Sequence, residues 1–380
     1  MSKSINLKMM ESDETSHSGN KFTLCSSIEM SPKIWGKFPE ELFEVVGARL
    51  PVATFFRFLS VNRKWNSILT SHTFRDRYDK IPITQPWVYA VTHKNAAMYD
   101  PCSNKWYHLK NHYFQEKMDI VPVASVGGIV CFVNLLQTRF FVGNPLTQTL
   151  KELPARSKIN WPIAVVGMWM YGKSIVEGYK IICINGELGQ YIIFDSIKNT
   201  WYESGVMPAI RMLPLYLSFL PQAISIDDCL YFTCSNPEGI ISYNMLSGVW
   251  NHFLVPNPRV LIANRFLVEC GGRIMLVGSV ESEIESCVSV RIWELQKMTL
   301  LWKEFDRMPS EWCLGLNRKN TIHMICIGNK DMIMLSFVSE KRNKFVTYDV
   351  LKKEWLQVSI RTRQRLERGI TFYPCITATV

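Results

Sequence analysis

Met98-Tyr99-Asp100-Pro101-Cys102-Ser103-Asn104-Lys105-Trp106 runs from an apolar pair through a polar turn into an aromatic residue. An Asp side chain can accept hydrogen bonds from the backbone ahead of it, and Pro presets φ for a turn. An apolar segment, a turn and an aromatic segment in this order predict a β-hairpin.

The same hairpin pattern recurs five more times along the chain. In each copy an Asp, Asn or Glu opens the turn, and the next segment begins with Trp or, once, with Leu. The later copies are Gly143-Asn144 to Leu150, Phe194-Asp195 to Trp201, Tyr243-Asn244 to Trp250, Trp293-Glu294 to Trp302 and Tyr348-Asp349 to Trp355. Successive acid or amide positions lie 44, 51, 49, 50 and 55 residues apart. Since chance does not place six hairpins at one period, the chain holds an internal repeat.

A second pattern precedes each later hairpin, in which a short turn leads directly into an apolar segment. These turns are Gly127-Gly128, Glu177-Gly178, Asp227-Asp228, Gly271-Gly272 and Asn329-Lys330-Asp331. Each repeat therefore holds four strands, which is typical of a β-propeller, in particular a kelch-like one. We expect the repeated aromatic residues to fill the space between neighbouring sheets rather than to bind a ligand.

The six units predict six four-stranded blades within residues 86–375. The first unit has room for only three strands, near 87–91, 97–99 and 106–109, while residues 369–373 form a lone strand at the far end. We expect this C-terminal strand to complete the first blade and to close the ring, because closure leaves no exposed sheet edge.

Loop lengths indicate which face of the propeller recognises another molecule. The variable loops connect the second and third strands of a blade or connect successive blades, and both sets emerge on the same side. Variable loops on a rigid scaffold are where recognition usually occurs. The candidate target-binding residues in the loops between blades are Arg156, Trp161, Arg211, Arg259, Trp312 and Arg318.

Residues 34–80 have a different, helical character. Pro39 occupies a first helical position, acidic residues follow in the first turn, and Pro51 ends the helix. We expect two more short helices, over 54–58 and around 61–69. The apolar content is high for so small a module, so part of it should face a partner.

This helical module resembles an F-box in Phe38-Pro39-Glu40-Glu41-Leu42, in Arg49-Leu50-Pro51 and in the run 55–66. Phe38 replaces the usual Leu, and Asn62 replaces the usual Cys, which would weaken docking slightly. The resemblance implies a face that packs on an Skp-like adaptor, whereas an isolated helical hairpin capping the next domain is the alternative. The implied adaptor-binding residues are Phe38, Pro39, Leu42, Val46, Leu50, Pro51, Phe58, Val61 and Trp65.

An F-box followed by kelch-like repeats is similar to the plant F-box/kelch-repeat family over most of residues 34–375. The resemblance implies a non-catalytic substrate receptor of an Skp–cullin–F-box ubiquitin ligase, whose propeller binds an unidentified target protein. The alternative is a propeller scaffold or transcriptional cofactor that acts without a ubiquitin ligase. A carbohydrate-binding or oxidase propeller is a more distant third.

The sequence motifs give no indication of a bound cofactor or metal. No phosphate-binding Gly-X-X-X-X-Gly-Lys loop, His-Glu-X-X-His or Gly-X-Ser-X-Gly motif is present, and we expect no cofactor or metal. The eleven Cys are scattered without a Cys-X-X-Cys pair, which favours buried, reduced thiols. Together with the absence of a signal-peptide pattern, this predicts a nuclear or cytoplasmic protein.

Charge and hydropathy limit the classes of partner that we expect. The formal net charge is +10, but the basic residues are spread out apart from Arg361, Arg363, Arg365 and Arg368. We therefore expect a solvated surface and no nucleic-acid partner. No uncharged apolar run reaches the roughly 18 residues of a membrane span, so we expect no membrane partner. Residues 1–30 are polar and lack periodicity, which predicts a disordered tail.

Overall fold

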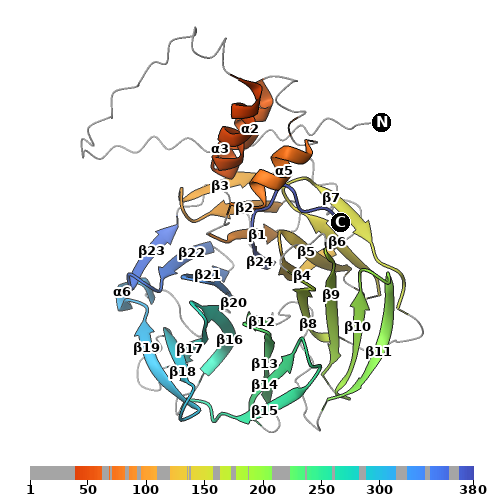
Figure 1. Ribbon diagram of the computed structural model, residues 1–380. Coiled ribbons are helices and arrows are strands. Elements are labelled where there is room, and N and C mark those ends of the chain that lie inside the picture. Colours follow the sequence, from red (N-terminus) through yellow and green to blue (C-terminus); the bar gives the residue numbers. More distant parts are fainter. Residues whose placement is uncertain are drawn as a thin grey trace.

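The structure is a computed structural model in which a short helical region precedes a ring of antiparallel sheets (Figure 1). It describes residues 39–61, 68, 71–81, 85–91, 96–108, 120–134, 136, 138–156, 163–172, 177–186, 188–207, 223–235, 238–258, 262–281, 288–313, 323–338, 343–358 and 368–380.

The helical region contains α2 (Glu40–Arg49), α3 (Val52–Val61) and α5 (His72–Tyr78). Pro39 is the N-cap of α2, and Pro51 separates α2 from α3 because its ring cannot continue a helix. Ser71 caps α5 by accepting a hydrogen bond from the Phe74 N–H. The second helix is longer than expected and includes Val61, which the sequence pattern assigned to a third helix; the intervening residues 62–67 lie outside the described ones.

Six four-stranded sheets follow, so the predicted six-bladed propeller is confirmed. Each sheet is antiparallel, and β24 lies beside β1 in the sheet that also holds β2 and β3. The strands are β1 (Trp87–Val91), β2 (Ala96–Asp100), β3 (Lys105–His108), β4 (Ile120–Val126), β5 (Ile129–Asn134), β6 (Phe140–Asn144), β7 (Thr149–Glu152), β8 (Ile163–Met170), β9 (Tyr179–Asn185), β10 (Gln190–Asp195), β11 (Thr200–Val206), β12 (Ile224–Ile226), β13 (Cys229–Ser235), β14 (Glu238–Asn244), β15 (Trp250–Leu254), β16 (Ile262–Cys270), β17 (Arg273–Glu281), β18 (Val288–Gln296), β19 (Leu301–Arg307), β20 (His323–Asn329), β21 (Met332–Val338), β22 (Asn343–Asp349), β23 (Glu354–Val358) and β24 (Arg368–Phe372). A one-turn helix, α6 (Ser310–Cys313), joins β19 to β20.

The repeated Asp or Asn residues build the turn between the two outer strands of a blade. Asp100 Oδ1 accepts a hydrogen bond from the Cys102 N–H at 2.9 Å, which fixes the start of the turn. Four residues after the Asp, Asn104 has a φ of 51° and redirects the chain into the next strand. The same side-chain-to-backbone bond is made by Asn144, Asp195, Asn244 and Asp349.

The repeated aromatic residues pack within and between blades, as predicted. The rings of Tyr99 and Trp106 face each other across the first hairpin with centroids 5.1 Å apart. Trp106 also lies 5.9 Å from Phe345 of the neighbouring sheet, so one side chain contacts two blades. Trp201 makes such contacts with Phe194 and Phe140, and Trp250 makes them with Tyr243 and Tyr191.

The C-terminal tail, residues 373–380, lies against the turns of the second blade. The fully buried Asn144 donates two hydrogen bonds from Nδ2, to the carbonyl oxygens of Cys375 at 2.7 Å and Ala378 at 2.9 Å. Gly128 approaches the same tail so closely that a Cβ there would clash with the Cβ of Cys375. These contacts hold the tail on the side of the ring where the turns are short.

The same tail is bonded to the end of the helical region. Thr377 Oγ1 donates a hydrogen bond to Asp79 Oδ1 at 2.6 Å, just beyond α5. The hydroxyl of Tyr78 donates to the carbonyl oxygen of Pro374 at 3.4 Å. The tail therefore connects the end of α5 to the second blade. The tail and the end of α5 are almost 300 positions apart in sequence.

We predict that Gly128→Ala destabilises the protein more than Gly272→Ala does. Both glycines end a turn between the first two strands of a blade and have positive φ, at 91° and 72°. A Cβ at Gly272 meets no atom within 4 Å, so strain of about 1 kcal/mol is expected there. Gly128→Ala adds the clash with the tail and should lower the free energy of unfolding by about 3 kcal/mol in urea titrations. Equal losses in the two variants would show that the tail is not packed there.

Candidate functional site

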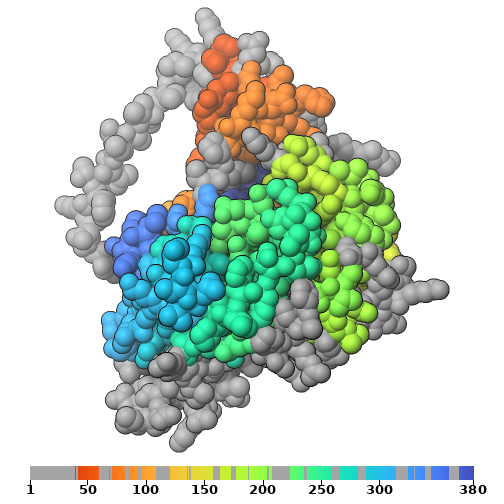
Figure 2. Space-filling model, turned by 60° about the horizontal axis from the view of Figure 1, so that its bottom comes forward, coloured from red at the N-terminus to blue at the C-terminus, as the bar shows by residue number. Residues whose placement is uncertain are grey.

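The helical region and the first two blades share one apolar core. Phe55 of α3 stacks on Phe74 of α5 with ring centroids 5.3 Å apart, and both side chains are buried. The same cluster continues into the propeller through Trp87, Tyr107, Phe132, Phe141 and Phe372. In Figure 2 the red and orange N-terminal part projects beyond the ring formed by the later blades. The helices are thus packed on the propeller through this shared core.

The proposed adaptor-binding residues divide into exposed and partly buried positions. Leu42 is 44% exposed, an unusual value for a leucine in a helix that has an apolar core beneath it. Pro39 and Pro51 are exposed, whereas Val46, Leu50 and Phe58 are half-buried. Leu42 and Val46 are four residues apart within α2, so they lie on one face of the helix, while Leu50 follows as its C-cap with an extended backbone. The side chain of Val61 and all of Phe38 and Trp65 lie outside the described residues.

A single carboxylate, that of Glu44, joins α2 to the start of α5. Ser71 and Thr73 each donate a hydrogen bond to Glu44, with both distances 2.6 Å, and Arg77 Nη1 lies 3.6 Å from Glu44 Oε2. Partial burial favours the neutral carboxyl, but the two hydroxyl bonds and the Arg77 charge outweigh it. The pKa of Glu44 is therefore lowered.

The predicted target-binding residues that the structure describes lie on connections between blades. Arg156 follows β7 and places its guanidinium carbon 5.5 Å from the Phe140 ring centre, and burial lowers its pKa. Trp312 lies in α6, where its carbonyl oxygen accepts a hydrogen bond from Lys344 Nζ at 2.6 Å. Figure 1 places α6 and β7 on opposite sides of the ring, so these two residues are not brought together. Trp161, Arg211, Arg259 and Arg318 lie outside the described residues.

The described part of the chain shows buried thiols and no cluster of metal-binding side chains. Burial raises the pKa of the thiols of Cys183, to about 12, and Cys234, to about 11, so both stay protonated at neutral pH. No group of three or more His, Cys, Asp or Glu side chains among the described residues could hold a metal ion. None of the described helices is long and apolar enough to cross a membrane.

One feature that the sequence pattern did not indicate is a cavity of about 1030 Å³ at the centre of the ring. It opens among the short turns between first and second strands, on the side where the tail and α5 lie. Asp227 and Asp228 line it, although in the sequence they mark only a turn. Ring geometry, which brings residues of different blades together, has no local sequence signal.

Comparisons with known proteins identify relatives of the whole arrangement. Residues 90–363 match the family model described as "F-box protein At3g26010-like, beta-propeller". F-box only protein 6 of Arabidopsis thaliana is 44% identical over 359 residues, which cover 92% of this chain and 76% of that protein. An F-box/kelch-repeat protein of the same plant, At3g61590, is 23% identical and covers 83% of this chain and 82% of its own. SKP1-interacting partner 15, also from Arabidopsis thaliana, is 20% identical over 88% of this chain and 95% of its own.

We predict that Glu44 stabilises the α2–α5 contact only while it is ionised. Because its pKa is lowered in the folded state, its contribution is complete above the ordinary value of 4.5 and is lost as the pH falls through the folded pKa. The difference in free energy of unfolding between the natural chain and Glu44→Gln should therefore shrink as the pH falls from about 7 to below 4.5. The exposed Glu311→Gln is the matched control and should show a small difference at every pH. A Glu44→Gln difference that does not change with pH would contradict this assignment.

Proposed function

Because the chain belongs to the family of F-box proteins with an At3g26010-like β-propeller, we propose that it is a substrate-recognition subunit of an Skp–cullin–F-box ubiquitin ligase. The helical module of residues 34–80 binds an Skp-like adaptor, and the adaptor links the chain to a cullin. The propeller of residues 86–375 binds the target protein. A relative whose name describes an SKP1-interacting partner supports the first of these contacts.

The exposed Leu42, on the same face of α2 as the half-buried Val46, is the single observation that carries this proposal. An apolar side chain is left in water at a cost of about 25 cal/mol per Å², which a partner's apolar groove removes. The opposite side of α2 is already occupied, because Glu44 is bonded to α5 and Ala48 is buried. A partner can therefore reach only the outer face of this helix.

The chain contributes by holding its target rather than by chemistry. Binding a target beside a ubiquitin-charged enzyme raises the effective concentration of the target's lysines. The proposed target-binding residues are the half-buried Arg156 and Trp312, which would contact a target from different parts of the ring, together with Trp161, Arg211, Arg259 and Arg318. We place this activity in the nucleus or cytoplasm, where ubiquitin ligases of this kind act.

We also propose the type of the propeller, the way its ring closes and a relationship within the family. The period near 50 residues and the Gly-Gly turns support a kelch-like propeller. The pairing of β24 with β1 supports ring closure by the C-terminal strand. The stretches 50–58, 144–148, 151–157 and 293–304 resemble the leaf-curling-responsiveness F-box protein, and we propose a relationship to that member of the family.

We predict that Leu42→Asp weakens binding to an Skp-like adaptor by at least about tenfold, because it buries an unpaired carboxylate in an apolar interface. Leu42 is a sharper choice than Leu50, which packs partly against the protein's own core. Leu254→Asp is the matched control, since Leu254 is 64% exposed on β15, far along the chain from the helices. Co-purification and titration of the purified adaptor measure both variants. Absence of adaptor binding by the natural chain would instead favour a scaffold that acts without a ubiquitin ligase.

We predict that Leu42→Asp also traps the target, because the target still binds the propeller but is no longer ubiquitinated. Proximity labelling with the natural chain should then enrich the target only when the proteasome is inhibited. Labelling with Leu42→Asp should enrich the same protein without the inhibitor. If neither proteasome inhibition nor Leu42→Asp changes which proteins are labelled, a role in degradation is contradicted.

A further inference from the structure

The central cavity is built by turns from all parts of the ring. Its walls include the Gly127 turn of the second blade, the Asp227-Asp228 turn of the fourth and the Gly271-Gly272 turn of the fifth. Tyr373 of the tail and Tyr78 at the end of α5 complete the wall. At about 1030 Å³ the cavity is far larger than an ion requires and is comparable to pockets that hold several side chains.

The charge of the wall is opposite to that of the whole chain. The carboxylates of Asp79, Asp227, Asp228, Glu269 and Asp331 line the cavity, and Lys330 is the one basic side chain among the described lining residues. The full chain, by contrast, has a formal net charge of +10. A locally acidic cavity in a basic protein attracts cationic groups.

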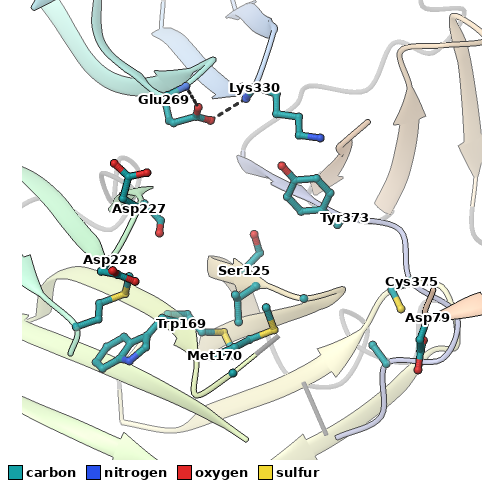
Figure 3. A pocket seen from close by; sticks show the side chains of 18 of the residues that line it. Asp79, Ser125, Trp169, Met170, Asp227, Asp228, Glu269, Lys330, Tyr373 and Cys375 are labelled. Atoms are coloured by element: carbon teal, nitrogen blue, oxygen red, sulfur yellow. Dashed lines mark hydrogen bonds between the residues drawn. The ribbon is translucent and has the colours of Figure 1, made fainter. Parts of the chain in front are cut away.

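Some of these carboxylates have structural roles and others do not. Glu269 accepts backbone N–H bonds from Gly272 and Lys330, both at 2.8 Å, as Figure 3 shows. Asp79 accepts the bond from Thr377 described above. Among the described residues, none forms a hydrogen bond or ion pair with the side chains of Asp227, Asp228 or Asp331. These three acceptors remain available to a ligand.

The rest of the wall is aromatic and apolar. Trp169 and Met170 lie on the side of the cavity below Asp228 in Figure 3, and Tyr373 lies across from them. The Lys330 ammonium already sits 5.4 Å from the centre of the Tyr373 ring. An intramolecular cation on this ring shows that the wall accommodates an alkylammonium group beside its aromatic face.

We propose that this cavity binds a lysine- or arginine-bearing segment of a partner protein that also carries apolar side chains. Charge complementarity decides the sign of the occupant, and the Tyr373 ring, which already has an ammonium group beside it, favours an organic cation over a hydrated ion. The carboxylates are dispersed over several blades, and no metal-binding group is present among the described residues. An extended cationic segment can meet them, whereas one metal ion cannot.

The site goes beyond the proposed ubiquitin-ligase role. It lies among the turns between first and second strands, whereas the proposed target face consists of loops that emerge on the opposite side. Because Tyr78, Asp79 and Ile81 line the cavity, an occupant would touch both the helical region and the propeller. The chain would then offer two separate recognition surfaces, one on each face of the ring.

The test uses the full chain and a fluorescein-labelled peptide of lysine and leucine residues, with a second peptide in which glutamate replaces each lysine. Fluorescence anisotropy should show saturable binding of the lysine peptide only. Asp227→Asn/Asp228→Asn should weaken it about fivefold or more, because two exposed charge contacts are lost. Asn suits the left-handed backbone of Asp227, whose φ is 51°, so the variant should fold; circular dichroism checks this.

The matched control is Glu311→Gln/Glu354→Gln, which removes two exposed carboxylates away from the cavity and should change the affinity less than about twofold. A photo-crosslinker on the peptide should label the chain within residues 168–172 or 225–228. Equal weakening in both double variants would overturn the proposal, because it would indicate attraction without a site. Absence of peptide binding would overturn the proposal as well. So would full displacement of the peptide by Mg²⁺ at an ionic strength at which NaCl leaves the peptide bound.

Discussion

The apolar core that the helices share with the first two blades is the contact on which the rest of the structure depends. Phe55 and Phe74 stack within the helical region, and the same cluster includes Trp87 and Phe372 of the propeller. Burial of side chains of this size contributes roughly 1.5 to 3 kcal/mol each, so the two parts support each other. The proposed receptor role would need such a connection, because a target held on a loosely attached propeller would rarely meet the ubiquitin-charged enzyme.

The tail adds polar contacts to that core and determines which surfaces remain open. Asn144 and Thr377 anchor it between the second blade and the end of α5. The short-turn side of the ring is consequently covered near the first two blades and open at its centre, where the acidic cavity lies. The proposed adaptor-binding helix and the proposed cationic site thus lie on different parts of the fold.

The sequence predicted the six blades and the packing role of the aromatic residues because both repeat at one period. Tyr99 and Trp106, for example, form the expected cross-strand pair. It did not predict the positive φ of Gln148, Leu300 and Lys353, since these residue types carry no preference for that backbone. The extent of α3 was underestimated, because its β-branched and aromatic residues weaken the helical pattern while tertiary packing stabilises the helix. The role of Asn144 could not be foreseen either, as its partners lie more than 230 positions away.

Amide hydrogen exchange of the full chain, alone and with a purified Skp-like adaptor, tests the central claim most directly. The exposed face of α2 predicts that the adaptor slows exchange within residues 39–61, through direct contact with the first two helices. Exchange in the outer strands of the fourth and fifth blades should stay unchanged, because no described contact joins them to the helices. Protection confined to the propeller, or no protection anywhere at saturating adaptor, would contradict an adaptor-binding role for this helical module.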